Sequence, residues 1–154
     1  MITILVVSSQ VSYVYYLLKN RFPAQGINDI LWIHAPFSLY HSWITVITVI
    51  SFFAAFTPEK TEDSHPTILV KVLVFIGLLV LEVIAVGYIE KFKGDIAGAI
   101  VIAWSLYGVF VAQDDPFIHW SALFFAIVTT IHIFKPFFMK YIRGSQAEHA
   151  PLLG

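Results

Sequence analysis

The chain has 154 residues, of which 58% are hydrophobic and only 12% are charged. Soluble domains carry about 25% charged residues, so this composition excludes an ordinary soluble domain and predicts a single all-α, polytopic membrane domain. The absence of cysteine excludes disulfides and thiolate chemistry. A net charge of −1 without a basic patch gives no indication of a nucleic-acid partner.

The first predicted membrane span covers residues 2–18. It lacks the positively charged start and the small-residue cleavage site of a typical signal peptide. The chain begins inside this apolar run, which leaves open that it is a fragment of a longer protein. Three tyrosines near the end of the span are predicted to lie in the aromatic belt at the membrane surface, namely Tyr13, Tyr15 and Tyr16.

The second predicted span covers residues 29–56 and is unusually polar. Pro36 lies inside it and predicts a kink near His34 or Ala35, because proline removes a helical hydrogen bond and crowds the preceding turn. Residues 35–46 add aromatic, imidazole and hydroxyl side chains to this proline, and a simple membrane anchor needs none of them. We therefore expect this helix to position a functional group.

Three further spans complete the predicted bundle of five transmembrane helices. They cover residues 66–89, 96–113 and 117–139. Asp95 is predicted to cap the fourth span, because a carboxylate accepts hydrogen bonds from the free N–H groups of a helix start. The transmembrane domain then covers residues 1–143, and residues 144–154 are predicted to form a flexible tail.

The loop charges predict the orientation of the bundle. Five spans place the first, third and last connections on one side of the membrane. That side carries the basic residues Lys19, Arg21, Lys91, Lys93, Lys140 and Arg143. The other side carries Lys60 and the acidic residues Glu59, Glu62, Asp63, Asp114 and Asp115. The positive-inside rule then predicts a non-cytosolic N-terminus and a cytosolic C-terminus, while the organelle is not indicated.

Three titratable side chains are predicted to lie inside the membrane at one level, namely His41, Glu82 and His132. Burying such a group costs about 2.5–3.5 kcal/mol, so these side chains are predicted to face the bundle, where Glu82 would accept a hydrogen bond from either histidine. Two interpretations stay open: a polar cluster that joins helices, or a ligand or proton site. No pair at i, i+3 or i, i+4 supports a metal site, and none is predicted.

Aromatic and glycine residues give two further expectations. Tyr40, Trp43 and Trp104 are predicted to lie deeper than the belt, either in the core or against a planar apolar ligand. Gly94 and Gly98, four residues apart, are predicted either to allow close helix approach or to shape the turn before the fourth span.

Two segments resemble a known family. The run Pro36-Phe37-Ser38-Leu39-Tyr40-x-x-Trp43-Ile44-Thr45-Val46 resembles a motif of the TspO/MBR-like tryptophan-rich sensory proteins. The run from Asp95 to Gly108 is similar to their alanine-rich, tryptophan-centred helix. Residues 31–36 and 117–122 look closest to uncharacterised fungal membrane proteins of this type. His41-Ser42 stands where relatives often have leucine and glycine.

The resemblance implies a five-helix bundle that binds a porphyrin, a sterol or a similar flat apolar ligand, without implying one enzymatic activity. The leading hypothesis is a non-enzymatic binding protein with a pocket between the second, third and fifth spans. Its predicted ligand-binding residues are Tyr40, His41, Trp43, Glu82, Trp104 and His132. The alternatives are an accessory or scaffolding subunit, and a proton-coupled transporter or intramembrane enzyme using Glu82 and a histidine. The lipid bilayer is the predicted partner, and a homodimer or larger membrane complex is left open.

Overall fold

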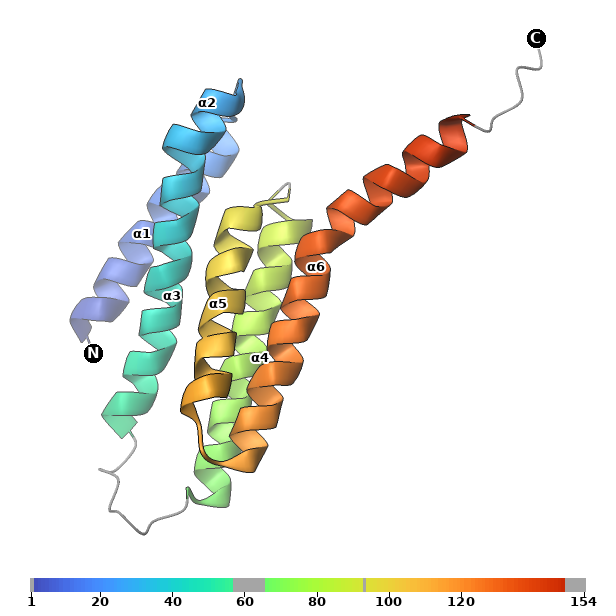
Figure 1. Ribbon diagram of the computed structural model, residues 1–154. Helices are drawn as coiled ribbons and strands as arrows, with labels where there is room; N and C mark the ends of the chain where they lie inside the picture. The colour runs from blue at the N-terminus through green and yellow to red at the C-terminus, as the bar shows by residue number, and fades with distance from the viewer. Residues whose placement is uncertain (1, 57–65, 93, 149–154) are drawn as a thin grey trace.

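The computed structural model describes residues 2–56, 66–92 and 94–148, and the regular structure in these ranges is entirely helical (Figure 1). The helices are α1 (Ile2–Arg21), α2 (Ile27–Asp29), α3 (Ala35–Phe56), α4 (Ile68–Glu90), α5 (Ile96–Ala112) and α6 (Pro116–Glu148). A π-helical turn, Ile30–His34, joins α2 to α3. The predicted all-α bundle is confirmed. Lys93 and the predicted loop charges Glu59, Lys60, Glu62 and Asp63 lie outside the described residues.

Four helical segments are long and apolar enough to cross a membrane. They are Ile2–Arg21, Ile27–Ala55, Ile68–Glu90 and Pro116–Met139. Helix α5 is apolar but shorter, at 17 residues, and its length of about 26 Å lies at the lower limit for a spanning helix. Together these helices make the chain an integral, multi-pass membrane protein.

The helices form two groups (Figure 1). Helices α4, α5 and α6 pack side by side, with α4 and α6 running in the same direction and α5 running against both. Helix α1 packs on α3, and α3 joins this pair to the other group mainly through α5. The ends of α1 and α4 and the beginnings of α3 and α5 therefore meet at one end of the bundle, which we call the Asp95 end.

Small residues allow the second group to pack closely. Ala99 on α5 and Ala122 and Ala126 on α6 have no exposed surface, and Ile102 and Leu106 of α5 are equally buried between them. Close packing of this kind stabilises helix pairs in a membrane. Lipid tails are as apolar as the side chains, so the hydrophobic effect does not drive the helices together there. The core of the protein therefore lies along α5.

The irregularity predicted near Pro36 takes the form of a widened turn. The N–H of Ala35 donates to the carbonyl oxygen of Ile30, five residues back, in the π-helical turn that ends at His34. Pro36 has no N–H for the carbonyl of Trp32, and its ring crowds that carbonyl in a regular α-helix. A π turn just before the proline accommodates both effects.

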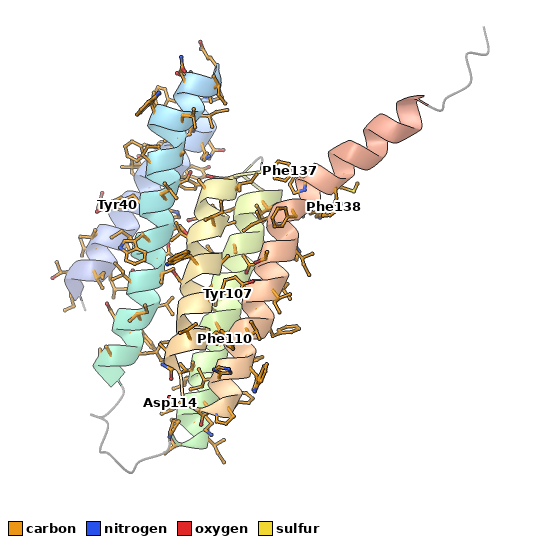
Figure 2. All side chains as sticks on the ribbon, viewed as in Figure 1. Tyr40, Tyr107, Phe110, Asp114, Phe137 and Phe138 are labelled. Atoms are coloured by element: carbon orange, nitrogen blue, oxygen red, sulfur yellow. The ribbon has the colours of Figure 1, made fainter. Side chains whose placement is uncertain are left out.

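Helix α6 is longer than the predicted span. It continues to Glu148, past the start of the flexible tail predicted at residue 144, because Gln146, Ala147 and Glu148 all favour helix. Residues 149–154 lie outside the described part of the chain. Pro136 lies inside α6, and the helix turns away from the bundle there, with Phe137 and Phe138 at the bend (Figures 1 and 2).

One aromatic-belt prediction is wrong. Tyr13 and Tyr16 are exposed, as belt residues would be, but Tyr15 is only 2% exposed and belongs to the core. Its ring stacks on His41 and forms T-shaped pairs with Tyr88 and Phe92. Successive residues of a helix point about 100° apart, so one of three neighbouring tyrosines can face inward while the others face out.

Candidate functional site

Asp95 caps helix α5, as predicted. The chain turns at Gly94, whose φ of +77° lies in the region that favours glycine. Asp95 follows, and its Oδ1 accepts a hydrogen bond from the N–H of Gly98 at 3.5 Å. The turn thus directs a carboxylate into the end of the bundle.

The same carboxylate also binds α1 and α3. Its Oδ2 accepts hydrogen bonds from the hydroxyls of Tyr15 at 2.7 Å and Ser38 at 2.5 Å, and lies 2.7 Å from the Lys19 ammonium. Asp95 is only 8% exposed. A capping residue predicted from local sequence is therefore the point at which three helices meet.

The charge of Asp95 is stabilised by these partners. Burial by itself raises the pKa of a carboxyl group. Here the hydrogen bonds from Lys19, Ser38 and Tyr15 and the Lys19 charge outweigh burial, so the pKa of Asp95 lies below its ordinary value. Asp95 and Lys19 therefore form a buried ion pair at neutral pH.

His41 extends this cluster toward the middle of the bundle. Its Nε2 lies 3.0 Å from Ser12 Oγ, and its Nδ1 is hydrogen-bonded to the Tyr88 hydroxyl. The Tyr15 and His41 rings stack with centroids 4.4 Å apart and planes 2° from parallel. His41 thus contacts α1 and α4 at the level of Tyr88, and the structure does not form the hydrogen bond expected between His41 and Glu82.

Gly98 makes room for Tyr88. A Cβ atom at Gly98 would lie 2.8 Å from two carbons of the Tyr88 ring, which is closer than van der Waals contact allows. The hydroxyl of Ser42 donates to the carbonyl oxygen of Gly98 at 2.7 Å, which draws α3 against the same turn of α5. Both expectations for the two glycines hold: Gly94 shapes the turn and Gly98 permits close approach.

A cavity of about 400 Å³ opens beside this cluster at the Asp95 end. Lys19, His34 and Asp95 supply its titratable groups. The rest of the lining is Pro23, Ala24, Ile30, Ala35, Phe92, Gly94, Ile96 and Ala97. Most of these side chains are apolar, and a few converging polar groups on an apolar wall are typical of small-molecule sites.

Glu82 and His132 lie near one another in a second place, between α4 and α6. Glu82 Oε2 is hydrogen-bonded to the Thr129 hydroxyl, and its Oε1 lies 3.9 Å from His132 Nδ1. That histidine nitrogen is also 2.9 Å from the carbonyl oxygen of Val128. The structure therefore brings these two of the six predicted ligand-binding residues together.

The three predicted aromatic residues lie elsewhere. Tyr40 and Trp43 are about half exposed on α3, and Trp104 on α5 is 77% exposed. The six predicted residues thus do not line one cavity between the second, third and fifth spans. Their roles in ligand binding remain predictions, and the aromatic ones face the surroundings of this chain.

Several residues of the Asp95 end were not predicted as a site. Local position in the sequence predicts a loop for Lys19, the aromatic belt for Tyr15 and a helix cap for Asp95. The only sequence signal was Ser38 and Ser42, two hydroxyls one turn apart in the apolar second span. Both in fact hydrogen-bond to the beginning of α5.

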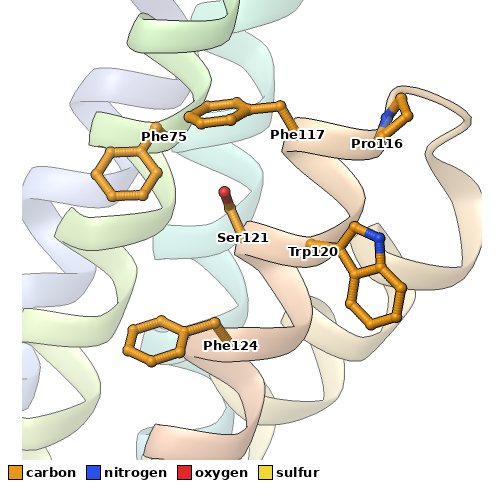
Figure 3. Close-up of a pocket in the computed structure, with 6 residues that line it drawn as sticks. All are labelled: Phe75, Pro116, Phe117, Trp120, Ser121 and Phe124. Atoms are coloured by element: carbon orange, nitrogen blue, oxygen red, sulfur yellow. The ribbon is translucent and has the colours of Figure 1, made fainter.

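A groove of about 500 Å³ lies between α4 and α6 at the other end of the bundle (Figure 3). It is lined by Phe75, Pro116, Phe117, Trp120, Ser121 and Phe124. Near this end, Lys71 pairs with Asp115 at 2.7 Å. The groove is almost wholly apolar and offers less polar recognition than the cavity at the Asp95 end. In the described part of the chain, no group of three or more His, Asp or Glu residues could hold a metal ion.

Apolar helices of spanning length with ionisable groups turned inward define a polytopic helical membrane protein. A family model described as "TSPO-like protein" matches residues 1–135. The chain belongs to this TSPO-like family, which confirms the family resemblance seen in the sequence. Comparison with curated proteins and with solved structures finds no match.

Proposed function

We propose that this TSPO-like membrane protein binds a small amphipathic ligand in the cavity at the Asp95 end. The observation that carries the proposal is the cavity itself, because apolar side chains from several helices surround three titratable ones. Its volume lies within the range of about 300–1,000 Å³ that is usual for small-molecule sites.

The charges at the cavity favour an uncharged polar group on the ligand. Lys19 and Asp95 neutralise one another, so neither offers a free charge. His34 is only 7% exposed and has no hydrogen bond to another described residue, which leaves its ring nitrogens for a ligand. A neutral imidazole both donates and accepts, as a hydroxyl or keto partner requires. A sterol-like ligand therefore fits better than a porphyrin, because the lysine that lines the cavity is already paired with Asp95 and is not free to bind a porphyrin carboxylate.

Filling the cavity is expected to weaken this binding. Ile30 lines the cavity, whereas the neighbouring Leu31 does not. We expect Ile30→Trp to weaken binding of a fluorescent sterol by at least about tenfold, which corresponds to about 1.4 kcal/mol. Leu31→Trp adds the same bulk outside the cavity and serves as the control. Titrations in nanodiscs with the sterol and, separately, with protoporphyrin measure both affinities. Equal binding by wild type and Ile30→Trp would contradict the proposed site.

We also propose that the Asp95 end faces the cytosol, which gives a non-cytosolic N-terminus and a cytosolic C-terminus. The basic residues of the loops at that end support this orientation. Since the chain has no cysteine, single cysteines can report it directly. Gln25 and Gln113 are exposed at opposite ends of the bundle.

In sealed vesicles with the cytosolic face outward, a membrane-impermeant maleimide is expected to label Gln25→Cys. It should label Gln113→Cys only after detergent opens the vesicles, because a charged reagent does not cross the hydrocarbon core. The parent chain without cysteine is the blank. The reverse labelling pattern would place the N-terminus in the cytosol.

The alternative functions remain proposals. An accessory subunit would copurify with a stoichiometric partner and would not bind sterol or porphyrin. A homodimer or a larger membrane complex is compatible with either function. That the nearest relatives are fungal also stays a prediction. A proton-coupled function is favoured by one specific observation, the environment of Glu82.

A further inference from the structure

Helices α4 and α6 run in the same direction and are joined by polar contacts at three levels. Lys71 pairs with Asp115, the residue before α6, near one end, and Glu90 pairs with Lys135 near the other. Glu82 meets Thr129 and His132 between them. Glu82 lies eight residues before Glu90, so it is about 12 Å deeper along the helix. Only this middle contact lies well inside the apolar part of the bundle.

The Thr129 hydroxyl lies close to two oxygen atoms but has one hydrogen to donate. Thr129 Oγ1 is within hydrogen-bond distance of Glu82 Oε2 and lies 2.9 Å from the carbonyl oxygen of Phe125. A threonine hydroxyl has one hydrogen, and a carbonyl oxygen can only accept. If Thr129 donates to Phe125, the hydrogen between Thr129 and Glu82 must come from the Glu82 carboxyl group.

The other oxygen of Glu82 leads to the same result. Oε1 is buried and has no hydrogen-bond partner among the described residues, and Glu82 as a whole is only 6% exposed. An ionised carboxylate in this position would have an unsolvated oxygen and a high desolvation cost. In a protonated carboxyl group the same oxygen is a neutral carbonyl, which is far less costly to bury.

His132 does not supply the missing hydrogen bond. Its Nδ1 lies 2.9 Å from the Val128 carbonyl, so this nitrogen carries a hydrogen that is directed at Val128. The distance of 3.9 Å from Nδ1 to Glu82 Oε1 is too long for a hydrogen bond. The other neighbouring helix, α5, contributes no charged side chain. Its one titratable residue is Tyr107, whose hydroxyl is hydrogen-bonded to the Thr130 hydroxyl.

We propose that Glu82 is a proton-binding site inside the membrane, with its carboxyl group protonated and donating to Thr129. Among the described residues, His132 is the titratable side chain that lies beside this carboxyl group, with its Nδ1 3.9 Å from Glu82 Oε1. Transfer of the proton to water breaks the O–H bond of Glu82 and leaves a carboxylate. The Thr129 hydroxyl then donates to this carboxylate instead of to the Phe125 carbonyl. This inference does not depend on the ligand cavity.

Infrared difference spectroscopy of the whole protein in nanodiscs tests the proposal. The wild type at neutral pH is expected to show the C=O stretching band of a protonated carboxyl group. Glu82→Gln should lose the whole band, whereas Glu90→Gln, which removes the exposed carboxylate of the same helix, should retain it. His132→Gln should also retain the band, because it leaves both the Glu82 carboxyl group and the Thr129 hydroxyl in place.

Thr129→Val provides an independent measurement that keeps the carboxyl group. It removes the proposed acceptor of the Glu82 proton, so the band should remain and change in frequency. This variant decides the question if Glu82→Gln does not fold. A wild-type spectrum without the band, or a band that neither Glu82→Gln nor Thr129→Val alters, would overturn the proposal.

Discussion

Asp95→Ala is expected to destabilise the folded protein by about 3–5 kcal/mol, the usual cost of removing one partner of a buried ion pair. The substitution leaves the Lys19 ammonium without its carboxylate and the hydroxyls of Tyr15 and Ser38 without their acceptor. It also removes the cap of α5. Since these contacts join α1 and α3 to the rest of the bundle, we expect the separation of these helices to accompany the loss of stability.

Reversible unfolding in mixed micelles, followed by tryptophan fluorescence and helical circular dichroism, measures this effect. Glu90→Ala is the matched control, because it removes a carboxylate from an exposed ion pair with Lys135 and should change stability little. Lys19→Met and the double variant Lys19→Met with Asp95→Ala complete a double-mutant cycle. This cycle measures the interaction energy between Lys19 and Asp95. If Asp95→Ala and Glu90→Ala had the same small effect, the proposed central role of Asp95 would be wrong.

The dependence of stability on pH gives a second measurement of the same contact. The folded-state pKa of Asp95 is lowered, so its contribution to stability is complete above the unfolded-state pKa of about 3.9. That contribution is lost as the pH falls from there through the folded-state pKa. We expect the free energy of unfolding of Asp95→Asn to lack this part of the decrease at low pH. The difference between this variant and the wild type should therefore become smaller as the pH falls.

Gly98→Ala is expected to cost about 1–3 kcal/mol, although alanine is the better helix former, because it forces an extra atom into a packed contact. The new Cβ would lie 2.8 Å from the Tyr88 ring. That ring has little freedom to move, since its hydroxyl is hydrogen-bonded to His41 and the ring packs against Tyr15 in a T-shaped pair. The substitution should therefore push α5 away from α4 and weaken the Tyr88–His41 hydrogen bond.

Gly108→Ala is the control, because it places the same atom on the same helix with nothing within 4 Å. It should leave stability unchanged or raise it by up to about 1 kcal/mol, the helix preference of alanine over glycine. The same unfolding assay measures both variants. Equal effects at Gly98 and Gly108 would show that helix propensity, and not the contact with Tyr88, decides the outcome.

The fold class could be predicted because it depends on properties of single segments. A run of apolar residues as long as the membrane is thick forms a spanning helix regardless of its neighbours, since every backbone group must bond within the segment. The predicted third span, 66–89, thus corresponds closely to α4 at Ile68–Glu90. The irregularity before Pro36 and the cap at Asp95 also follow from local chemistry.

The candidate site could be predicted only in part, because its contacts join distant segments. Estimated depth placed His41, Glu82 and His132 at one level, but depth does not say how a helix is rotated or which helix lies beside it. His41 points toward Tyr15 and Tyr88, while Glu82 and His132 lie near each other between α4 and α6. Helix rotation follows from packing, such as the fit of Gly98 against Tyr88.

By itself, therefore, the sequence determined that this is a helical membrane protein of the TSPO-like family, because hydropathy, helix length and motif are carried by each segment alone. Only the tertiary structure decided that Asp95 binds Tyr15, which is 80 positions away along the chain. It also decided that Lys19 is a half-buried partner of Asp95 and that the predicted aromatic residues face outward. The physical reason is that a buried charge takes whichever partner close packing brings within reach, and close packing is a property of the whole bundle.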